Sequence, residues 1–290
     1  MTHDEYPALY KAADSASEEA QSTYLLFIRA HVFLLLVGAG LTINPMPTKE
    51  YSLFNALIFI AALGISILLA TKNYEKVWYS ARALAESVKT ASWRYMMKAD
   101  PFLDAESVKE VKALFRNLLV EILGANNQLG EVLGGADSAG EQITGKMSSI
   151  RSMNLEERKA TYLTYRIDEQ RKWYADKSAH NKRRGIQFFL ALITLQVLAL
   201  VCVLLRIAYP EWKLWPTDVF VVAAGGVVTW IQLKRYREIT TAYALTAHEI
   251  GIVRGKLQEA ENDAEFSEFV RDAENAFSRE HTQWAAKHDN

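Results

Sequence analysis

The sequence has only one cysteine among its 290 residues. Cys202 therefore has no partner within the chain for a disulfide, and a cysteine-rich zinc site is excluded. Histidine is also scarce, with 6 residues, and none of them falls in an H-E-x-x-H motif or a Cys/His spacing typical of metal sites. We expect no metal site and no cofactor.

The chain also lacks an excess of charge of either sign. Its 33 basic and 34 acidic residues give a formal net charge of −1. No segment joins a dense basic face to the stacking aromatic residues that nucleic-acid-binding proteins use, which argues against nucleic acid as a partner. No nucleophile and base can be paired from the sequence, so we expect that the protein is not an enzyme.

One segment has the spacing of a phosphate-binding loop. Residues 140–147 read GEQITGKM, which fits G-x-x-x-x-G-K. Met147 stands where this motif needs a serine or threonine for magnesium, and no strand is predicted before it. We interpret the segment as part of a connector.

Long apolar runs are what the sequence does have. A bilayer core about 30 Å thick needs roughly 20 apolar residues in a helix. Four runs come near this length: residues 24–43, 53–70, 186–205 and 219–233. They predict an all-α integral membrane protein with four transmembrane helices in two hairpins.

Basic residues flank these spans on one side of the membrane. They follow the second and fourth spans and precede the third: Lys72, Lys76, Arg82, Lys177, Lys182, Arg183, Arg184, Lys234, Arg235 and Arg237. The connectors within the hairpins are short, contain prolines and carry few basic residues. Under the positive-inside rule, we expect a multi-pass protein of the inner (cell) membrane with both termini in the cytoplasm.

The segments outside the spans have helical periodicity. Apolar residues recur at steps of three and four in residues 77–95, 108–122, 239–257 and 266–284, which predicts cytosolic amphipathic helices. Their apolar faces must pack on one another, on another copy of the chain, or on a partner. No proline or glycine lies between Leu68 and Ala99 or between Leu233 and Ile250, so we expect the second and fourth spans to continue into these helices without a hinge.

The two halves of the chain follow the same plan. Residues 125–150 contain five glycines and no sustained periodicity, which predicts a flexible Gly-rich linker. It separates an N-terminal two-span module, residues 1–124, from a C-terminal one, residues 151–290. Residues 72–74 and 234–236 occupy equivalent places after the second span of each module.

Some residues in the spans are polar. Arg29 and His31 lie in the first span, where an ionisable residue is a functional candidate, although Arg29 can also extend to the inner headgroups. Thr194, Gln196 and Thr229 lie in the later spans. These five are candidate pore-lining residues, and contact between helices is the alternative for the last three.

The segments YLTYRIDEQRKWYADKS (162–178) and FVRDAENAFSREHTQW (269–284) carry a family resemblance. With the spans between them, they resemble the SLATT family, the two-transmembrane effector domains that associate with SMODS nucleotidyltransferases and SLOG sensors. The first half resembles a more divergent module of the same kind. The family-pattern residues are Arg171, Trp173, Tyr174, Lys177, Glu274, Glu280 and Trp284.

The resemblance implies a membrane-perforating effector of bacterial anti-phage conflict, triggered when infection is sensed. Four spans cannot enclose an aqueous path, so we expect a homo-oligomer in the lipid bilayer. This chain has no recognisable sensor segment, so a separate sensor or nucleotide-generating protein is the expected partner. The alternative is a membrane-anchored scaffold whose cytosolic helices dock a partner protein.

Overall fold

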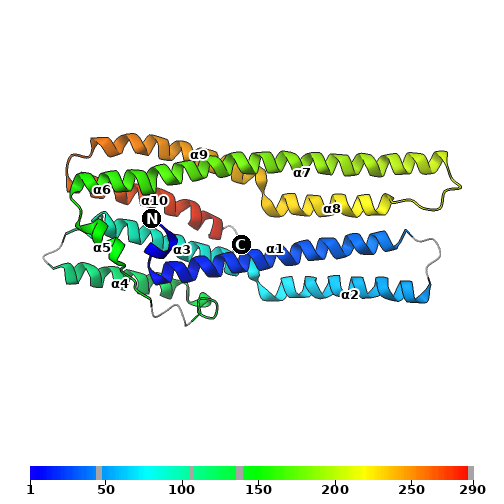
Figure 1. Ribbon diagram of the computed structural model, residues 1–290, viewed down its shortest axis with the longest axis horizontal. Coiled ribbons are helices and arrows are strands. Elements are labelled where there is room, and N and C mark those ends of the chain that lie inside the picture. Colours follow the sequence, from blue (N-terminus) through cyan, green and yellow to red (C-terminus); the bar gives the residue numbers. More distant parts are fainter. Residues whose placement is uncertain (44–47, 105–106, 135–139, 287–290) are drawn as a thin grey trace. The chain divides into compact units, whose positions relative to one another are not determined.

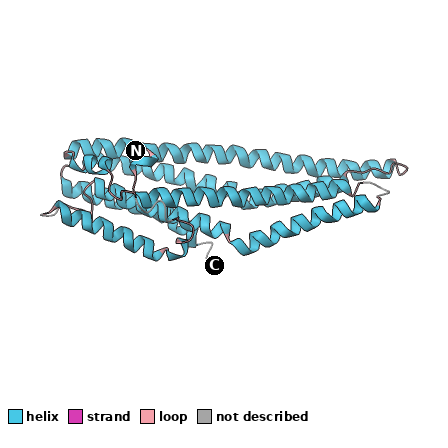
Figure 2. Cartoon of the chain, turned by 60° about the horizontal axis from the view of Figure 1, so that its bottom comes forward, coloured by secondary structure: helices cyan, strands magenta, loops and turns pink. Residues whose placement is uncertain are grey.

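The computed structural model describes residues 1–43, 48–104, 107–134 and 140–286, with side chains up to Phe277 in the last range. All regular secondary structure in these ranges is helical, which confirms the all-α class (Figures 1 and 2). Four helices are long and apolar enough to cross a membrane, as predicted. The apolar spans lie in α1 (Ala8–Leu41), α2 (Lys49–Lys72), α7 (Glu169–Ala208) and α8 (Thr217–Lys234).

The chain divides into two compact units that do not follow its halves. Unit 1 contains residues 1–22, 74–173 and 246–290, and unit 2 contains residues 23–73 and 174–245. Each half of the sequence therefore contributes to both units.

Unit 2 consists of the two hairpins and the beginning of α9 (Tyr236–Lys256). Its outer surface is apolar: Phe33 and Leu53 are each 64% exposed and Ile207 is 74% exposed. Such a surface suits lipid rather than water. The four spans fit a multi-pass membrane protein.

Small residues let the helices of unit 2 approach closely. A Cβ on Gly38 of α1 would lie 2.9 Å from the Phe59 ring of α2, and a Cβ on Gly226 of α8 would lie 2.6 Å from Cγ1 of Val32 of α1. Glycine at such positions lets membrane helices pack with their backbones near one another. The second contact joins the first hairpin to the second.

Unit 1 is built around α3 (Tyr74–Met96). It packs against α10 (Asp263–Ala286), α4 (Val108–Ala125) and α5 (Gly145–Ser152). The predicted apolar face of α3 is confirmed from Ala81 onward, because Ala81, Leu84, Val88, Ala91 and Tyr95 are all buried, whereas Val77 near its start is only half-buried. The face of α10 is confirmed up to Phe277 by buried Phe266, Val270, Ala273 and Phe277.

The helix α4 departs from its predicted pattern. Val111 and Phe115 are buried as expected, but Val108 is 70% exposed, and Leu119 is buried while Leu118 is only half-buried. Val108 is the first residue of the helix, immediately after the N-cap Ser107, so it lies beyond the packed turn.

The uninterrupted passage predicted after the second and fourth spans is wrong. The helix α2 ends at Lys72, and Asn73 adopts a left-handed conformation (φ 47°) before α3 begins. The helix α8 ends at Lys234, and Arg235 does the same (φ 43°) before α9 begins. A single residue with positive φ ends a helix without proline or glycine, and asparagine tolerates this conformation well.

The first and third spans are the uninterrupted ones. The helix α1 runs through 34 residues and α7 through 40. Both modules therefore share one arrangement, in which the first span is continuous with its lead-in helix and the second is separated from its extension by one left-handed residue. The equivalence of residues 72–74 and 234–236 noted in the sequence agrees with this.

The predicted linker, residues 125–150, is partly structured. Met147 and Ile150 are buried in α5, and Thr144 caps that helix while its hydroxyl donates to the Glu5 carbonyl at 2.8 Å. This part is therefore not a free linker, because a capped amphipathic turn anchors it to the N-terminal residues. Residues 135–139 lie outside those that the structure describes, and the module limits 1–124 and 151–290 stay a prediction.

Candidate functional site

An ion pair lies at the centre of unit 1. Arg166 is 2% exposed and Glu274 of α10 is fully buried. The Arg166 Nε donates to Glu274 Oε1 at 2.8 Å and its Nη2 donates to Oε2 at 2.7 Å. This two-pronged geometry is the strongest that an arginine and a carboxylate can form.

Two neutral side chains complete the shell of the Glu274 carboxylate. The Tyr162 hydroxyl donates to Oε1 at 2.9 Å, and the Thr90 hydroxyl of α3 donates to Oε2 at 3.1 Å. Burying a charge pair is costly unless the remaining hydrogen-bonding capacity is satisfied. Here the carboxylate accepts from three residues, so this polar core fixes how α3 and α10 pack around it.

The surroundings of the pair favour the charged form of Arg166. Burial alone would lower the pKa of Arg166, but the adjacent Glu274 raises it above its usual value. Burial, followed by the charge of Glu274, raises the pKa of Tyr162 well above its usual value, so that the phenol stays a hydrogen-bond donor. The Arg166 guanidinium also lies 4.8 Å from the centre of the Phe277 ring.

A π-helical turn places the Arg166 side chain in this core. The helix α6 (Leu155–Tyr162) starts with a capping box at Asn154 and Glu157, and residues 163–168 then widen into a π-helix before α7. The turn places Arg166 and Ile167 inside the unit. Such insertions change the register of a helix locally and often mark functional positions.

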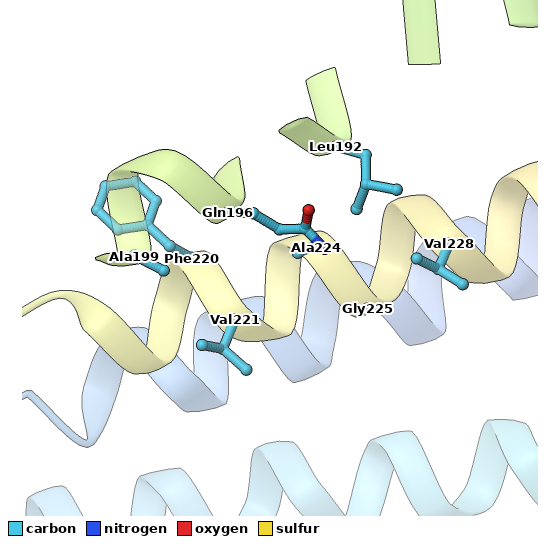
Figure 3. Close-up of a pocket in the computed structure, with 8 residues that line it drawn as sticks. All are labelled: Leu192, Gln196, Ala199, Phe220, Val221, Ala224, Gly225 and Val228. Atoms are coloured by element: carbon cyan, nitrogen blue, oxygen red, sulfur yellow. The ribbon is translucent and has the colours of Figure 1, made fainter. Parts of the chain in front are cut away.

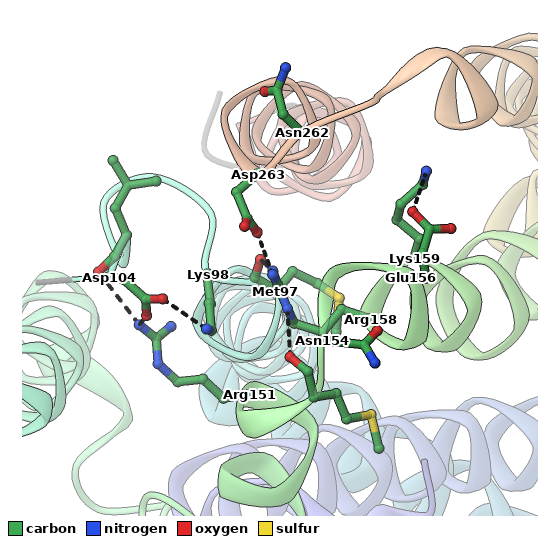
Figure 4. A network of polar contacts seen from close by, with 12 residues as sticks. Met97, Lys98, Asp104, Arg151, Asn154, Glu156, Arg158, Lys159, Asn262 and Asp263 are labelled. Atoms are coloured by element: carbon green, nitrogen blue, oxygen red, sulfur yellow. Dashed lines mark hydrogen bonds and ion pairs between the residues drawn. The ribbon is translucent and has the colours of Figure 1, made fainter.

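A second polar network closes the end of α3 (Figure 4). Arg158 is 2% exposed, and its guanidinium donates to the carbonyls of Met97 at 2.8 Å and Met153 at 3.2 Å and pairs with Asp263. Arg151 donates to the Tyr95 carbonyl at 2.6 Å. These arginines satisfy carbonyl groups that a helix leaves open at its C-terminus.

Asp104 lies beside the same network. It pairs with Lys98 at 2.8 Å and with Arg151 at 3.3 Å. The hydrogen bond from Lys98 lowers the pKa of Asp104. The carboxylate is mostly exposed, so its contribution to stability is small.

Unit 2 holds a cavity of about 360 Å³ between α7 and α8 (Figure 3). Its wall is apolar except for Gln196, whose exposed side chain extends toward α8 near Ala224. Within the residues that the structure describes, no group of three or more His, Cys, Asp and Glu side chains is arranged to hold a metal ion.

Both halves of the sequence match known domain families. Residues 7–159 match SMODS and SLOG-associating 2TM effector domain 3, and residues 162–284 match SMODS and SLOG-associating 2TM effector domain 1. The chain belongs to the SLATT family. It carries two SLATT domains in tandem. A comparison with curated proteins found no match, and a comparison with solved structures found none.

The polar core joins the two SLATT domains. Arg166, Tyr162 and Glu274 belong to the second domain, whereas Thr90 belongs to the first. The network of Figure 4 does the same, since Arg158 lies in the first match and Asp263 in the second. Unit 1 is therefore formed jointly by both domains.

The family-pattern residues have different surroundings. Glu274 is the centre of the core. Tyr174 is 1% exposed and lies edge-on to Tyr243 with ring centres 5.3 Å apart. Arg171 is exposed, 3.9 Å from Asp168, and Trp173 and Lys177 are also exposed. The side chains of Glu280 and Trp284 lie outside the described residues.

Arg166 and Thr90 are functional residues that the sequence did not predict as candidates. Arg166 falls inside the quoted segment 162–178 and lies four residues after Tyr162, so both can share a helix face. The sequence signal that could have found Arg166 is its position on the same helix face as an aromatic residue. Thr90 gave none, because a threonine within an amphipathic helix is ordinary.

The predicted intramembrane residues do not come together. The His31 Nδ1 lies 3.2 Å from the Ala62 carbonyl and 3.4 Å from the Ser66 hydroxyl, so it is part of the contact between α1 and α2. Thr194 and Thr229 donate to carbonyls of their own helices, at Leu190 and Gly225.

Arg29 and Gln196 are placed differently. Arg29 stacks over Trp230 of α8, and Gln196 lines the cavity of Figure 3. A pore-lining role for the five residues stays a prediction.

Proposed function

We propose that this tandem SLATT protein is an oligomeric effector of bacterial anti-phage conflict, which permeabilises the inner membrane when its extramembrane helices rearrange. The observation that carries the proposal is the match of both halves to two-transmembrane effector domains. The termini and unit 1 face the cytoplasm in this proposal, and no catalytic step is required.

The Arg166–Glu274 core is the element that holds the resting state. A trigger that separates this pair would leave two buried charges without partners, which costs several kcal/mol and forces unit 1 to repack. Arg166 lies in the helical stretch that continues from Leu155 to Ala208. Repacking around Arg166 is therefore passed along α7 into the third span.

Several copies must assemble for permeation. Most of the surface of the four spans in one chain contacts lipid or the other spans, so one chain encloses no aqueous path. Closed cyclic symmetry is the ordinary arrangement of identical subunits in a homo-oligomer. A separate protein that senses infection or makes a nucleotide signal is the proposed source of the trigger.

Dye release from liposomes tests the proposal. Glu274→Gln removes the charge that holds Arg166 while keeping the shape of the side chain, and we expect it to release dye without a trigger. Glu268→Gln is the matched control, because Glu268 pairs only at the exposed surface with Arg271 of the same helix. If Glu274→Gln stays folded and helical by circular dichroism but releases no more dye than this control, the proposed resting-state role is wrong.

A glycine insertion tests whether repacking in unit 1 reaches the third span through α7. Two glycines placed after Trp173 in α7 interrupt the continuous helix and should abolish the dye release of Glu274→Gln. The same insertion beside Asn73, where the helix already ends, should leave that release largely intact. A protein that never releases dye in any of these forms would instead support a membrane-anchored scaffold.

A further inference from the structure

Two cations lie against one tryptophan in unit 2. The guanidinium carbon of Arg29, on α1, is 5.2 Å from the centre of the Trp230 ring on α8. The Lys234 ammonium nitrogen is 5.4 Å from the centre of the same ring. The site therefore takes one cation from each SLATT domain.

The structure holds the ring of Trp230 in place. Its Nε1 donates to the Tyr236 hydroxyl at 3.1 Å. Tyr236 is buried and stacks on Phe188 with ring centres 5.6 Å apart, and its Cβ lies so close to Gly185 that a side chain there would meet it at 3.2 Å. The indole is thus positioned by α7 and α9 before any ligand arrives.

Neither cation is neutralised by an anion. Among the described residues, Arg29 and Lys234 take part in no ion pair and no hydrogen bond. The acidic residues of unit 2 that belong to this end of the hairpins are Asp176 and Glu238, and Glu238 pairs with Arg235. Two like charges close to a low-dielectric region repel each other unless an anion lies between or beside them.

The place of the site in the spans identifies the chemistry of that anion. Lys234 is the last residue of α8 and directly follows the predicted span 219–233, and Arg29 stacks on Trp230 one turn earlier, so both cations lie at the predicted end of that span. Basic side chains at this depth extend into the headgroup layer, and basic pockets between transmembrane helices bind anionic headgroups.

We propose that Arg29, Lys234 and Trp230 form a phosphate site that an anionic lipid headgroup occupies. The two cations bind the phosphate, and the indole supports them. Because the cations come from different hairpins, a bound headgroup stabilises the contact between α1 and α8, where Gly226 already lets the helices approach. A soluble phosphate compound has the same chemistry, so the test separates the two sources.

Lipid retention is the measurement. The full chain is purified in nanodiscs of phosphatidylcholine with a minority of phosphatidylglycerol, and the lipids that remain bound are counted by native mass spectrometry. We expect phosphatidylglycerol to be enriched on the wild-type chain. Arg29→Gln and Lys234→Gln should each lower this enrichment about fivefold, the usual effect of one basic residue at an anionic surface.

Matched controls separate site binding from general charge. Arg206→Gln and Lys213→Gln remove cations from the other end of the hairpin and should leave the enrichment unchanged. Arg29→Lys keeps the charge and should retain most of it. Equal enrichment in wild type and in both site variants, with helicity unchanged, overturns the proposal.

A second arm distinguishes the source of the phosphate. In nanodiscs of phosphatidylcholine alone, added inorganic phosphate should not raise the melting temperature, whereas phosphatidylglycerol should raise it for the wild type and not for Arg29→Gln. A phosphate-induced rise that Arg29→Gln abolishes overturns the lipid as occupant and assigns the site to a soluble compound. The readouts are independent of dye release, so this proposal and the proposed function can fail separately.

Discussion

The two units of this SLATT protein are built with opposite interiors and surfaces. Unit 1 encloses charge, with Arg166 and Glu274 among its most buried residues, and it buries the apolar faces of α3 and α10. Unit 2 presents apolar side chains outward, as at Ile60, which is 63% exposed, and its helices meet through glycines. Specific polar contacts therefore determine the packing of unit 1, and steric fit determines that of unit 2.

The largest expected effect is the loss of stability in unit 1 when the buried carboxylate is removed. Glu274→Ala leaves Arg166 buried without a partner and is expected to destabilise unit 1 by roughly 3–5 kcal/mol. Hydrogen exchange in detergent should show lost protection in α3 and α10 but not in α2 and α8. Glu268→Ala, at the surface of the same helix, is the control, and an equal loss in α2 and α8 would contradict independent stabilisation.

The network at the end of α3 should have the next largest effect. Arg158→Ala leaves the carbonyls of Met97 and Met153 without this donor and should cost roughly 2–3 kcal/mol in denaturant unfolding. Arg271→Ala is the control, because its pairs with Glu268 and Asp272 lie at the exposed surface and contribute little. A similar loss for both variants would show that the buried position of Arg158 is unimportant.

A smaller effect is expected from steric change in unit 2. Gly226→Ala places a methyl group 2.6 Å from Val32 and should destabilise the contact between α1 and α8 by about 1–3 kcal/mol. Gly225→Ala meets nothing within 4 Å and should be nearly neutral. Thermal melting of both variants in the same detergent measures the difference, which should vanish if α1 and α8 do not pack this way.

The smallest expected effect is that of alkaline pH, which should lower the stability of unit 1 only at high pH. The pKa of Tyr162 is raised in the fold, so the stability from its neutral form is complete below about pH 10, the value for an unfolded tyrosine, and declines as pH rises further. Burial raises the pKa of Tyr6 in the same way. Tyr162→Phe should make the decline of melting temperature above pH 10 shallower, and an unchanged slope would contradict the assignment.

Hydropathy and periodicity were enough to predict the four spans and the buried faces of α3 and α10. These features repeat along the chain, and each can be read from a window of about twenty residues. The domain family was also recognisable from two segments of the second half. Local signals of this kind reflect the solvent that each helix face meets.

The remaining features depend on contacts between distant residues or on one backbone angle. Arg166 and Glu274 are 108 residues apart, and no local pattern pairs them. The breaks at Asn73 and Arg235 each involve one left-handed residue, which neither a glycine nor a proline announces. Gly145 contributed to the predicted flexible linker, but it is the first residue of a helix that Thr144 caps.

The hydrogen bond from Thr90 to Glu274 has an evolutionary consequence. The hydroxyl and the carboxylate that accepts from it are encoded in opposite halves of one gene, so a substitution at either position alone removes the bond. Recombination that exchanged a single half between relatives would separate a donor from its acceptor. The two halves of the gene therefore depend on each other through one hydrogen bond of 3.1 Å.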